Sequence, residues 1–184
     1  SAAGVESFAQ YVLENFPQVT SVVAAETIEE AIKDADVIMA TTSTDIRGSE
    51  AFPYFPTEAI KPGALLLLPA AARFDDDFII NDARLVLDAR GLYDAWAEEY
   101  GTQAYQLLGI PGTHFHDLMR DGKLPESKLE EIADVATGKI PARRNDEEII
   151  LYSVGGMPIE DVAWATDLYQ SAEEKNIGQA LNLW

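Results

Sequence analysis

The stretch that decides the fold is residues 148–184, EIILYSVGGMPIEDVAWATDLYQSAEEKNIGQALNLW. Residues 149–152 form a short apolar and partly β-branched run, which predicts a buried strand. The run ends in the turn SVGG at 153–156, where two glycines allow backbone angles and close approaches that other residues do not. Pro158 suits the first turn of a helix, and two acidic residues follow it near the positive end of the helix dipole. We therefore expect a strand, a glycine turn and an amphipathic helix at about 158–175, with one face able to pack.

The glycine turn is the first candidate for contact with a ligand. It lies between a strand end and a helix start, and the free N–H groups of a helix start point toward whatever occupies such a turn. The other interpretation is that Gly155 and Gly156 only turn the chain, and that Asp161 only favours the helix end.

Strands and helices alternate through the first hundred residues, which predicts an α/β domain with a parallel sheet. The leucine run at 65–68 indicates a strand buried on both faces. Residues 107–140 depart from this alternation. The expected strands before that region are 19–25, 37–41, 65–68 and 85–87, and the expected helices are 3–16, 28–35, 91–105 and, beyond the turns, 127–137.

Hydroxyl side chains follow the predicted strand at 37–41. Thr41, Thr42 and Ser43 lie at its carboxyl end, where ligands sit in doubly wound sheets. Their hydroxyl groups can hydrogen-bond a ribose or an amide without adding charge. The alternative is that they only cap the next segment.

Composition indicates a globular protein and disfavours some partners. The 184 residues are 47% apolar, and 32 acidic against 13 basic side chains give a formal charge of -19. Such a charge repels phosphate backbones and anionic lipid surfaces, so nucleic-acid and membrane binding are not expected. There is no cysteine, no run long enough to span a membrane and no signal-peptide pattern, so the cytoplasm is the expected location.

Other polar and aromatic residues receive structural interpretations. His114 and His116 flank Phe115 in what the pattern indicates is a loop, and no cysteine or regularly spaced carboxylate accompanies them, so no metal site is expected. Arg143 and Arg144 are expected in solvent. Two tryptophans, Trp96 and Trp164, are expected in the core.

The amino-acid sequences of several segments resemble those of one protein family. SVGGMPIEDVAW followed by a helix and IGQALNLW is similar to the carboxy-terminal segment of the ornithine cyclodeaminase and mu-crystallin family. ADVIMATTS, IKPGALLLL and KLEEIADVATGKIPAR occur in the order that this family shows. The resemblance implies a Rossmann domain that binds NAD or NADP, with Ser153, Val154, Gly155 and Gly156 at the nicotinamide end. It also implies that Thr41, Thr42 and Ser43 face the cofactor.

The same resemblance implies an oxidoreductase that exchanges hydride at the Cα of an amino or imino acid. Family members of the cyclodeaminase type carry a glycine-rich turn with an aspartate that assists chemistry at the amine, whereas residues 69–73 here read PAAAR. Alanine cannot bind an ammonium group or transfer a proton. Two alternatives remain: a cyclodeaminase whose acid comes from elsewhere, such as Asp75, or a dinucleotide-binding protein without catalysis. The sequence assigns no catalytic residue and does not separate NAD from NADP.

In the Rossmann strand order 3-2-1-4-5-6, the first strand carries a G-x-G-x-x-G turn, and no glycines here have that spacing after a strand. The expected fold class is therefore α/β: a Rossmann-like parallel sheet lacking its first two strands in this chain, with a carboxy-terminal strand-turn-helix that returns toward a substrate domain. We assign the expected strand near Val22 to position 3 of that Rossmann order, and we expect the strand near Ile38 to have an unpaired edge.

The expected organisation is a second part of a dinucleotide-binding domain at 1–106, a helical connection at 107–146 and the strand-turn-helix segment at 147–184. The expected partners are a missing amino-terminal piece, possibly present as a separate chain, and a second copy in a homodimer.

Overall fold

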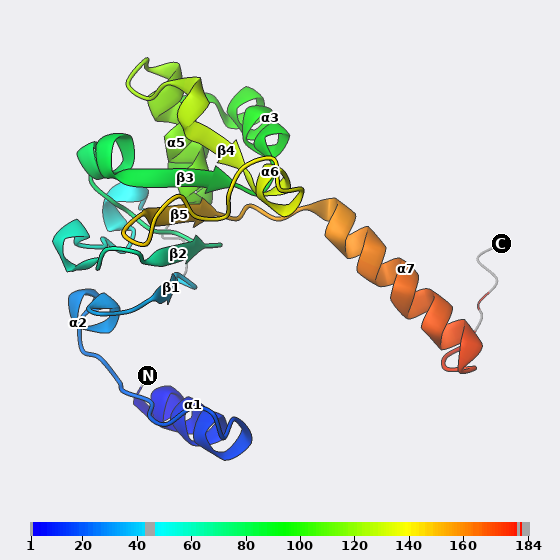
Figure 1. Ribbon diagram of the computed structural model, residues 1–184. Coiled ribbons are helices and arrows are strands. Elements are labelled where there is room, and N and C mark those ends of the chain that lie inside the picture. The colour runs from blue at the N-terminus through cyan, green and yellow to red at the C-terminus, as the bar shows by residue number, and fades with distance from the viewer. Residues whose placement is uncertain (1, 43–46, 180, 182–184) are drawn as a thin grey trace.

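A five-stranded, fully parallel sheet forms the centre of the molecule in a computed structural model that describes residues 2–42, 47–179 and 181 (Figure 1). The strand order is β1-β2-β5-β3-β4. This architecture confirms the predicted α/β class. The strands are β1 (Val37–Met39), β2 (Leu65–Leu68), β3 (Ala83–Leu87), β4 (Leu129–Glu131) and β5 (Ile149–Ser153).

Strand β5 is the last in sequence and yet lies in the middle of the sheet. Leu151 pairs with Leu66 of β2 on one side and with Leu85 of β3 on the other. A central strand is covered on its faces and hydrogen-bonded along both edges, which suits the apolar run predicted here. The strand predicted at 149–152 is confirmed, and the sheet brings its turn into the middle of one edge.

Helices cover mainly one face of the sheet. Tyr93 of α3 and both Phe115 and Leu118 of α5 belong to the same buried core as the leucines of β2, β3 and β5. The helices are α1 (Ala2–Asn15), α2 (Ile28–Ile32), α3 (Arg90–Tyr100), α4 (Ala104–Leu108), α5 (Pro111–Arg120), α6 (Ile132–Ala136) and α7 (Pro158–Glu174), with a π-helical turn at Phe78–Asp82 before β3.

The opposite face of the sheet is only partly covered, by α6. A cavity of about 410 Å³ lies there between two α6 side chains, Ile132 and Val135, and apolar side chains of β2, β3 and β5. Alternate leucines of β2 are accordingly half-buried, at Leu65 and Leu67. The prediction that residues 65–68 are buried on both faces is therefore wrong for this face.

The strand predicted at 19–25 does not form. These residues have no regular secondary structure, and the side chain of Val23 is 80% exposed. They do not pair with the outer edge of β1, which pairs with no strand in the described part of the chain. The predicted open edge at Ile38 is thus confirmed, although only Ile38 of β1 is buried.

Three helix predictions need correction. The helix predicted at 91–105 is divided, because Gly101 has a φ of 58° and separates α3 from α4. Helix α5 was not predicted, although Pro111 stands at its first position. The helix predicted at 127–137 is instead the strand β4 followed by the short helix α6, and β4 pairs in parallel with β3.

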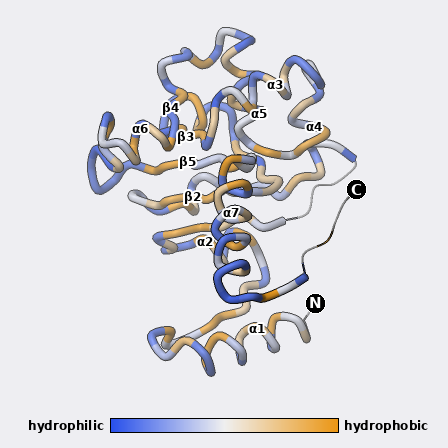
Figure 2. The backbone as a smooth tube through the Cα atoms, turned by 90° about the vertical axis from the view of Figure 1, so that its right-hand side faces the viewer, coloured by the Kyte–Doolittle hydropathy of each residue, from blue (hydrophilic) through white to orange (hydrophobic). Residues whose placement is uncertain are grey.

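Helix α7 confirms the helix predicted at about 158–175, with its end one residue earlier. Its surroundings differ from the prediction. It extends away from the sheet (Figure 1), and no residue of it is buried in the described chain. Trp164, expected in the core, is 70% exposed. Helix α1 also lies apart from the sheet, with hydrophobic and hydrophilic residues alternating along it (Figure 2). The predicted packing face of α7 therefore has no partner within the described residues.

Candidate functional site

The carboxyl ends of the parallel strands meet along one edge of the sheet. Beyond β1, the N–H of Ala40 donates to the carbonyl of Leu67 at 3.0 Å. Beyond β5, the N–H of Val154 donates to the carbonyl of Leu68 at 3.2 Å. The N–H of Asp88, just after β3, donates to the carbonyl of Ser153 at 3.2 Å. Segments far apart in the sequence are therefore neighbours at the edge where α/β sheets bind ligands.

Asp88 holds the glycine turn in place. Its Oδ2 atom accepts hydrogen bonds from the N–H groups of Gly155 and Gly156, both at 2.7 Å, and its Oδ1 accepts one from the N–H of Ala89 at 2.9 Å. The residue is 2% exposed. Because these two glycine N–H groups already bind a carboxylate, they are not available to a phosphate.

The two glycines of the turn differ in what surrounds them. A Cβ atom at Gly155 would lie 2.7 Å from Leu92 Cδ2 and 2.7 Å from Trp96 Cη2, so the turn packs directly on α3. Gly156 has a φ of 98°, which favours glycine, but nothing lies within 4 Å of the Cβ position there. Gly155 is needed for close packing and Gly156 for its backbone angle.

Ser153 is buried beneath the turn. It has no exposed surface, and its Oγ accepts hydrogen bonds from the N–H of Gly112 at 2.8 Å and from the hydroxyl of Tyr93 at 3.2 Å. Burial raises the pKa of Tyr93 above its usual value, which keeps this hydroxyl a donor. The Ser153 side chain therefore joins β5 to α3 and to the first turn of α5.

The hydroxyl residues after β1 reach the turn at residues 69–73, PAAAR, which we call the alanine turn. The Thr42 hydroxyl donates a hydrogen bond to the carbonyl of Ala71, while Thr41 is exposed. Both threonines line a cavity of about 330 Å³ beside β1. Ser43, the third predicted cofactor residue of this group, lies outside the described residues.

The alanine turn offers no acid. Ala71 is 0% exposed and Ala72 is 1% exposed. The nearest carboxylates in sequence have other partners: Asp75 accepts a hydrogen bond from the Tyr54 hydroxyl at 2.7 Å, and Asp76 lies 2.8 Å from Nε2 of His114. Both carboxylates thus have partners outside the alanine turn.

Both histidines lie on α5 rather than in a loop. His114 stacks on the ring of Tyr105 with centroids 4.8 Å apart, and Nε2 of His116 lies 3.1 Å from Asp94. Within the described residues, no group of three or more histidine or acidic side chains is arranged to hold a metal ion. His114 lines a cavity of about 560 Å³ with Asp117, whose pKa is raised by burial despite the nearby Arg120.

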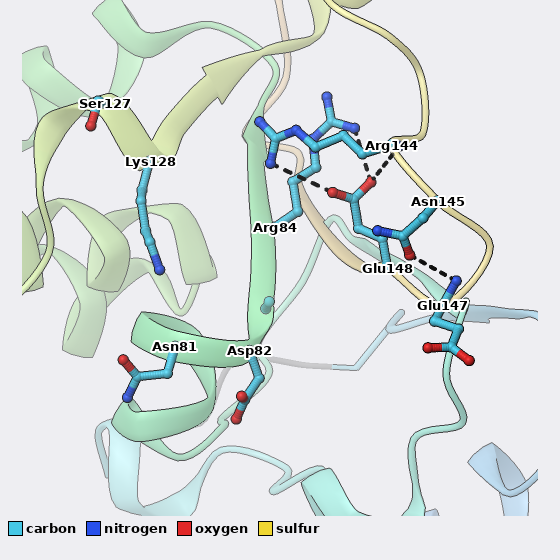
Figure 3. A pocket seen from close by; sticks show the side chains of 10 residues that line it. Asn81, Asp82, Arg84, Ser127, Lys128, Arg144, Asn145, Glu147 and Glu148 are labelled. Carbon is cyan, nitrogen blue, oxygen red and sulfur yellow. Dashed lines mark hydrogen bonds and ion pairs between the residues drawn. The ribbon is translucent and has the colours of Figure 1, made fainter.

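A second polar cavity, of about 410 Å³, lies at the opposite edge, where β3, β4 and β5 begin (Figure 3). Its centre is the buried Arg84, which contacts Glu130 at 2.6 Å and Glu148 at 3.2 Å and donates to two backbone carbonyls. Burial alone would lower the pKa of Arg84, but the hydrogen bonds to both glutamates hold it above its usual value. Arg144, expected in solvent, also contacts both glutamates. Because all three nitrogens of the Arg84 guanidinium are hydrogen-bonded within the protein, we interpret this network as structural.

Asp88 is the residue that sequence reasoning missed at the candidate site. It follows the buried run Leu85-Val86-Leu87 directly, and an acidic residue at the carboxyl end of such a strand was the available signal. Its partners were not visible in the sequence, because Gly155 is 67 residues away.

The parallel sheet and its helices form a Rossmann-like α/β domain. A sequence model of the ornithine cyclodeaminase/mu-crystallin family matches residues 1–176, and the chain belongs to this family. The resemblance drawn from residues 148–184 is thereby confirmed.

Individual relatives agree with this assignment. The chain is 28% identical over 163 residues to N-((2S)-2-amino-2-carboxyethyl)-L-glutamate dehydrogenase of Staphylococcus aureus, covering 88% of this chain and 42% of the relative. It is 26% identical over 181 residues to Delta(1)-pyrroline-2-carboxylate reductase of Bacillus cereus, covering 95% and 48%. An archaeal alanine dehydrogenase dimer with bound NAD has a similar fold, with a TM-score of 0.68 and 22% identity, covering 97% and 49%.

The chain spans about half the length of the relatives it matches. In those relatives the matching region is part of one longer chain, so the expectation of an amino-terminal piece on a separate chain has no support and is not kept. Among the described residues, no helix has the length and apolar character needed to cross a bilayer.

Proposed function

We propose that this protein is an NAD(P)-dependent oxidoreductase that acts on an amino or imino acid, with the nicotinamide end of the cofactor at the carboxyl edge of the sheet. The supporting observation is the meeting of the glycine turn, the threonines after β1 and the alanine turn at that edge. The relatives named above are dehydrogenases and reductases of amino or imino acids.

The residues present suit the nicotinamide end better than the phosphates. The N–H groups of Gly155 and Gly156 bind Asp88, so the turn offers an uncharged backbone surface at Val154 and Gly156. Thr41 and Thr42 supply hydroxyl groups from the end of β1, two strands away from β5, while Ser153 positions the turn from below. Ser43, which follows them in the sequence, is proposed for the same role. The nicotinamide, when bound, supplies the hydride acceptor or donor.

The reaction class follows from this assignment. Oxidation of an amino acid removes hydride from Cα and a proton from nitrogen, which gives an imino acid; reduction runs the other way. The chain must hold the reacting carbon against the nicotinamide and exclude water, which are the protein's tasks in hydride transfer. The proline and alanine side chains of the turn cannot act as an acid or base, so the turn itself supplies no residue that moves the proton.

Ornithine cyclodeamination is the second candidate, and the alanine turn argues against it. The buried Ala71 and Ala72 stand where the family resemblance places the acid, and Asp75 is engaged with Tyr54. A catalytically silent dinucleotide-binding protein is the third candidate, and the same alanines favour it.

One assay separates the three candidates. The purified protein is mixed with NAD+ or NADP+ and a panel of basic, aliphatic and aromatic amino acids, or with the reduced cofactor and cyclic imines. The absorbance of reduced nicotinamide and the release of ammonia are both followed. Substrate-dependent change in absorbance supports the proposed function. Ammonia release from ornithine without net reduction of the cofactor supports a cyclodeaminase, and cofactor binding without turnover across the panel supports a silent binding protein.

We further propose that the working form is a homodimer. Helix α7 carries exposed apolar side chains, among them Ile159, Trp164 and Leu168, and the alanine dehydrogenase of similar fold is a dimer. Sedimentation velocity tests this, and a monomer at micromolar concentration with full activity contradicts it.

A further inference from the structure

The carboxylate of Asp88 is a buried charge directly behind the glycine turn. Three backbone N–H donors face its two oxygens, at 2.7, 2.7 and 2.9 Å. Three donors with no acceptor are the surroundings that an ionised carboxylate takes, since it can only accept hydrogen bonds. No ion pair of Asp88 with a lysine, arginine or histidine is found in the part of the chain that the structure describes. The negative charge is therefore held by dipoles rather than cancelled by a cation.

The position of this charge is important because the glycine turn lies between the Asp88 carboxylate and any ligand that rests on the turn. Asp88 lies against the N–H groups of the Gly155-Gly156 backbone, and there is open space at Gly156, with no atom within 4 Å of its Cβ position. One layer of peptide backbone thus stands between the buried charge and a ligand resting on the turn. A low-dielectric layer of this thickness screens charge far less than water does.

We propose that Asp88 sets the preference of the site between oxidised and reduced nicotinamide. This inference rests on the proposed function, because it requires the nicotinamide end to lie at the glycine turn. The oxidised ring carries a positive charge and the reduced ring carries none. A fixed negative charge behind the turn attracts the oxidised ring selectively, so Asp88 strengthens binding of the oxidised cofactor relative to the reduced one.

The size of the effect follows from Coulomb's law. At an effective dielectric constant of about 20, two opposite unit charges about 8 Å apart attract by an amount equal to roughly a thirtyfold preference. The three N–H dipoles oppose part of the carboxylate charge. We therefore expect Asp88 to contribute a factor of about five to ten.

A purely structural role for Asp88 predicts something different. Loss of its hydrogen bonds would loosen the turn and weaken both cofactor forms by the same factor. The ratio of the two dissociation constants is thus the decisive measurement, since it is insensitive to a general loosening of the turn and sensitive to the charge.

The experiment compares Asp88→Asn with Tyr93→Phe by calorimetric titration with the oxidised and the reduced cofactor. Tyr93→Phe is the matched control, because it removes a neutral hydroxyl that contacts Ser153 and also interacts with Asp88, which contributes to the raised pKa of Tyr93, and it leaves the charge unchanged. We expect the ratio Kd(oxidised)/Kd(reduced) to rise about fivefold to tenfold in Asp88→Asn and to stay within about twofold in Tyr93→Phe. An unchanged ratio in a folded, cofactor-binding Asp88→Asn protein overturns the inference and leaves the proposed function intact, whereas failure of the unmodified protein to bind either form overturns the proposed function.

If Asp88→Asn does not fold, the unmodified protein still tests the idea. The benzamide analogue of the cofactor keeps the planar ring and the carboxamide but lacks the ring charge. We expect the oxidised cofactor to bind about fivefold or more tightly than this analogue. Equal or weaker binding of the charged ring overturns the inference.

Discussion

The hydroxyl oxygen of Ser153, at the end of β5, accepts a hydrogen bond from the N–H of Gly112 in the first turn of α5 at 2.8 Å. A strand end thereby supplies the cap that the start of a helix needs. The same contact fixes the distance between the middle of the sheet and the helix that covers it. A Cβ at Gly112 would lie 2.2 Å from Tyr93 Cε1, so the junction has no spare room.

The first prediction concerns this cap. Ser153→Ala should lower the free energy of unfolding by about 1–3 kcal/mol, because it leaves the buried N–H of Gly112 without an acceptor. Thr166→Ala is the control, since its hydroxyl also forms a hydrogen bond with a backbone group, here donating to the Val162 carbonyl on the exposed α7. The control should stay within about 0.5 kcal/mol. Denaturant unfolding measures both, and equal effects would contradict a special role for Ser153.

The second prediction separates the two glycines of the turn. Gly155→Ala should cost about 1–3 kcal/mol, because its Cβ overlaps Leu92 and Trp96. Gly156→Ala meets no atom and should cost about 1 kcal/mol through its positive φ alone. The bulkier Gly155→Leu change would disturb this packing, so it is a poor probe of cofactor binding, even though Gly155 lies in the turn that we propose contacts the cofactor. Gly156→Ala, checked by circular dichroism and then titrated with cofactor, is the better probe.

The third prediction addresses the buried network at the opposite edge of the sheet. Arg84→Met should destabilise by about 3–5 kcal/mol, since it leaves Glu130 and Glu148 partly buried without their main cation. Arg144→Met removes a half-exposed arginine that contacts the same two glutamates and should cost less than about 1 kcal/mol. Urea unfolding of the two variants side by side gives the comparison. A larger loss in Arg144→Met would show that the exposed arginine carries the network.

The fourth prediction is a loss of stability at alkaline pH. Burial raises the pKa of Tyr93 and of Tyr105 in the folded protein. Between the unfolded pKa, about 10, and the raised folded pKa, the unfolded chain loses protons that the folded protein keeps. Stability is therefore full below about pH 10 and falls as the pH rises, by up to about 1.4 kcal/mol per pH unit for each tyrosine.

Three variants test this alkaline loss by guanidinium unfolding across the range from about pH 9 to 11. Tyr93→Phe and Tyr105→Phe should each flatten the decline. Tyr11→Phe, on an exposed face of α1, should leave it unchanged. Identical slopes in all three variants would show that other groups cause the decline.

The fifth prediction concerns the alanine turn. Ala71→Asp should not create ornithine cyclodeaminase activity, and it should destabilise the fold by several kcal/mol, about 3 or more, because the new carboxylate is buried without a partner. Ala70→Asp, at a position in the same turn that is only partly buried, is the control for adding charge. Ammonia release and thermal unfolding are the readouts. Ammonia production by a folded Ala71→Asp protein would refute the prediction.

Local sequence was enough to find many elements of this protein. The run at 149–152, the glycine turn and Pro158 predict a strand, a turn and a helix, and β5 and α7 confirm them. The leucines at 65–68 and the run at 85–87 likewise predict β2 and β3. These signals are local, because apolar runs, glycine and proline act on the backbone within a few residues. The assignment of Thr41, Thr42 and residues 153–156 to a cofactor stays a prediction.

Only the tertiary structure decided how these pieces meet. It placed β5 between β2 and β3, left residues 19–25 without a strand and left α7 without a packing partner among the described residues. It also brought the Asp88 carboxylate to the N–H groups of Gly155 and Gly156, across 67 and 68 residues of chain. Strand neighbours and buried hydrogen-bond partners are chosen by long-range burial and by the need to satisfy every buried polar group. That choice depends on the whole fold, so the residues near each partner in the sequence do not reveal it.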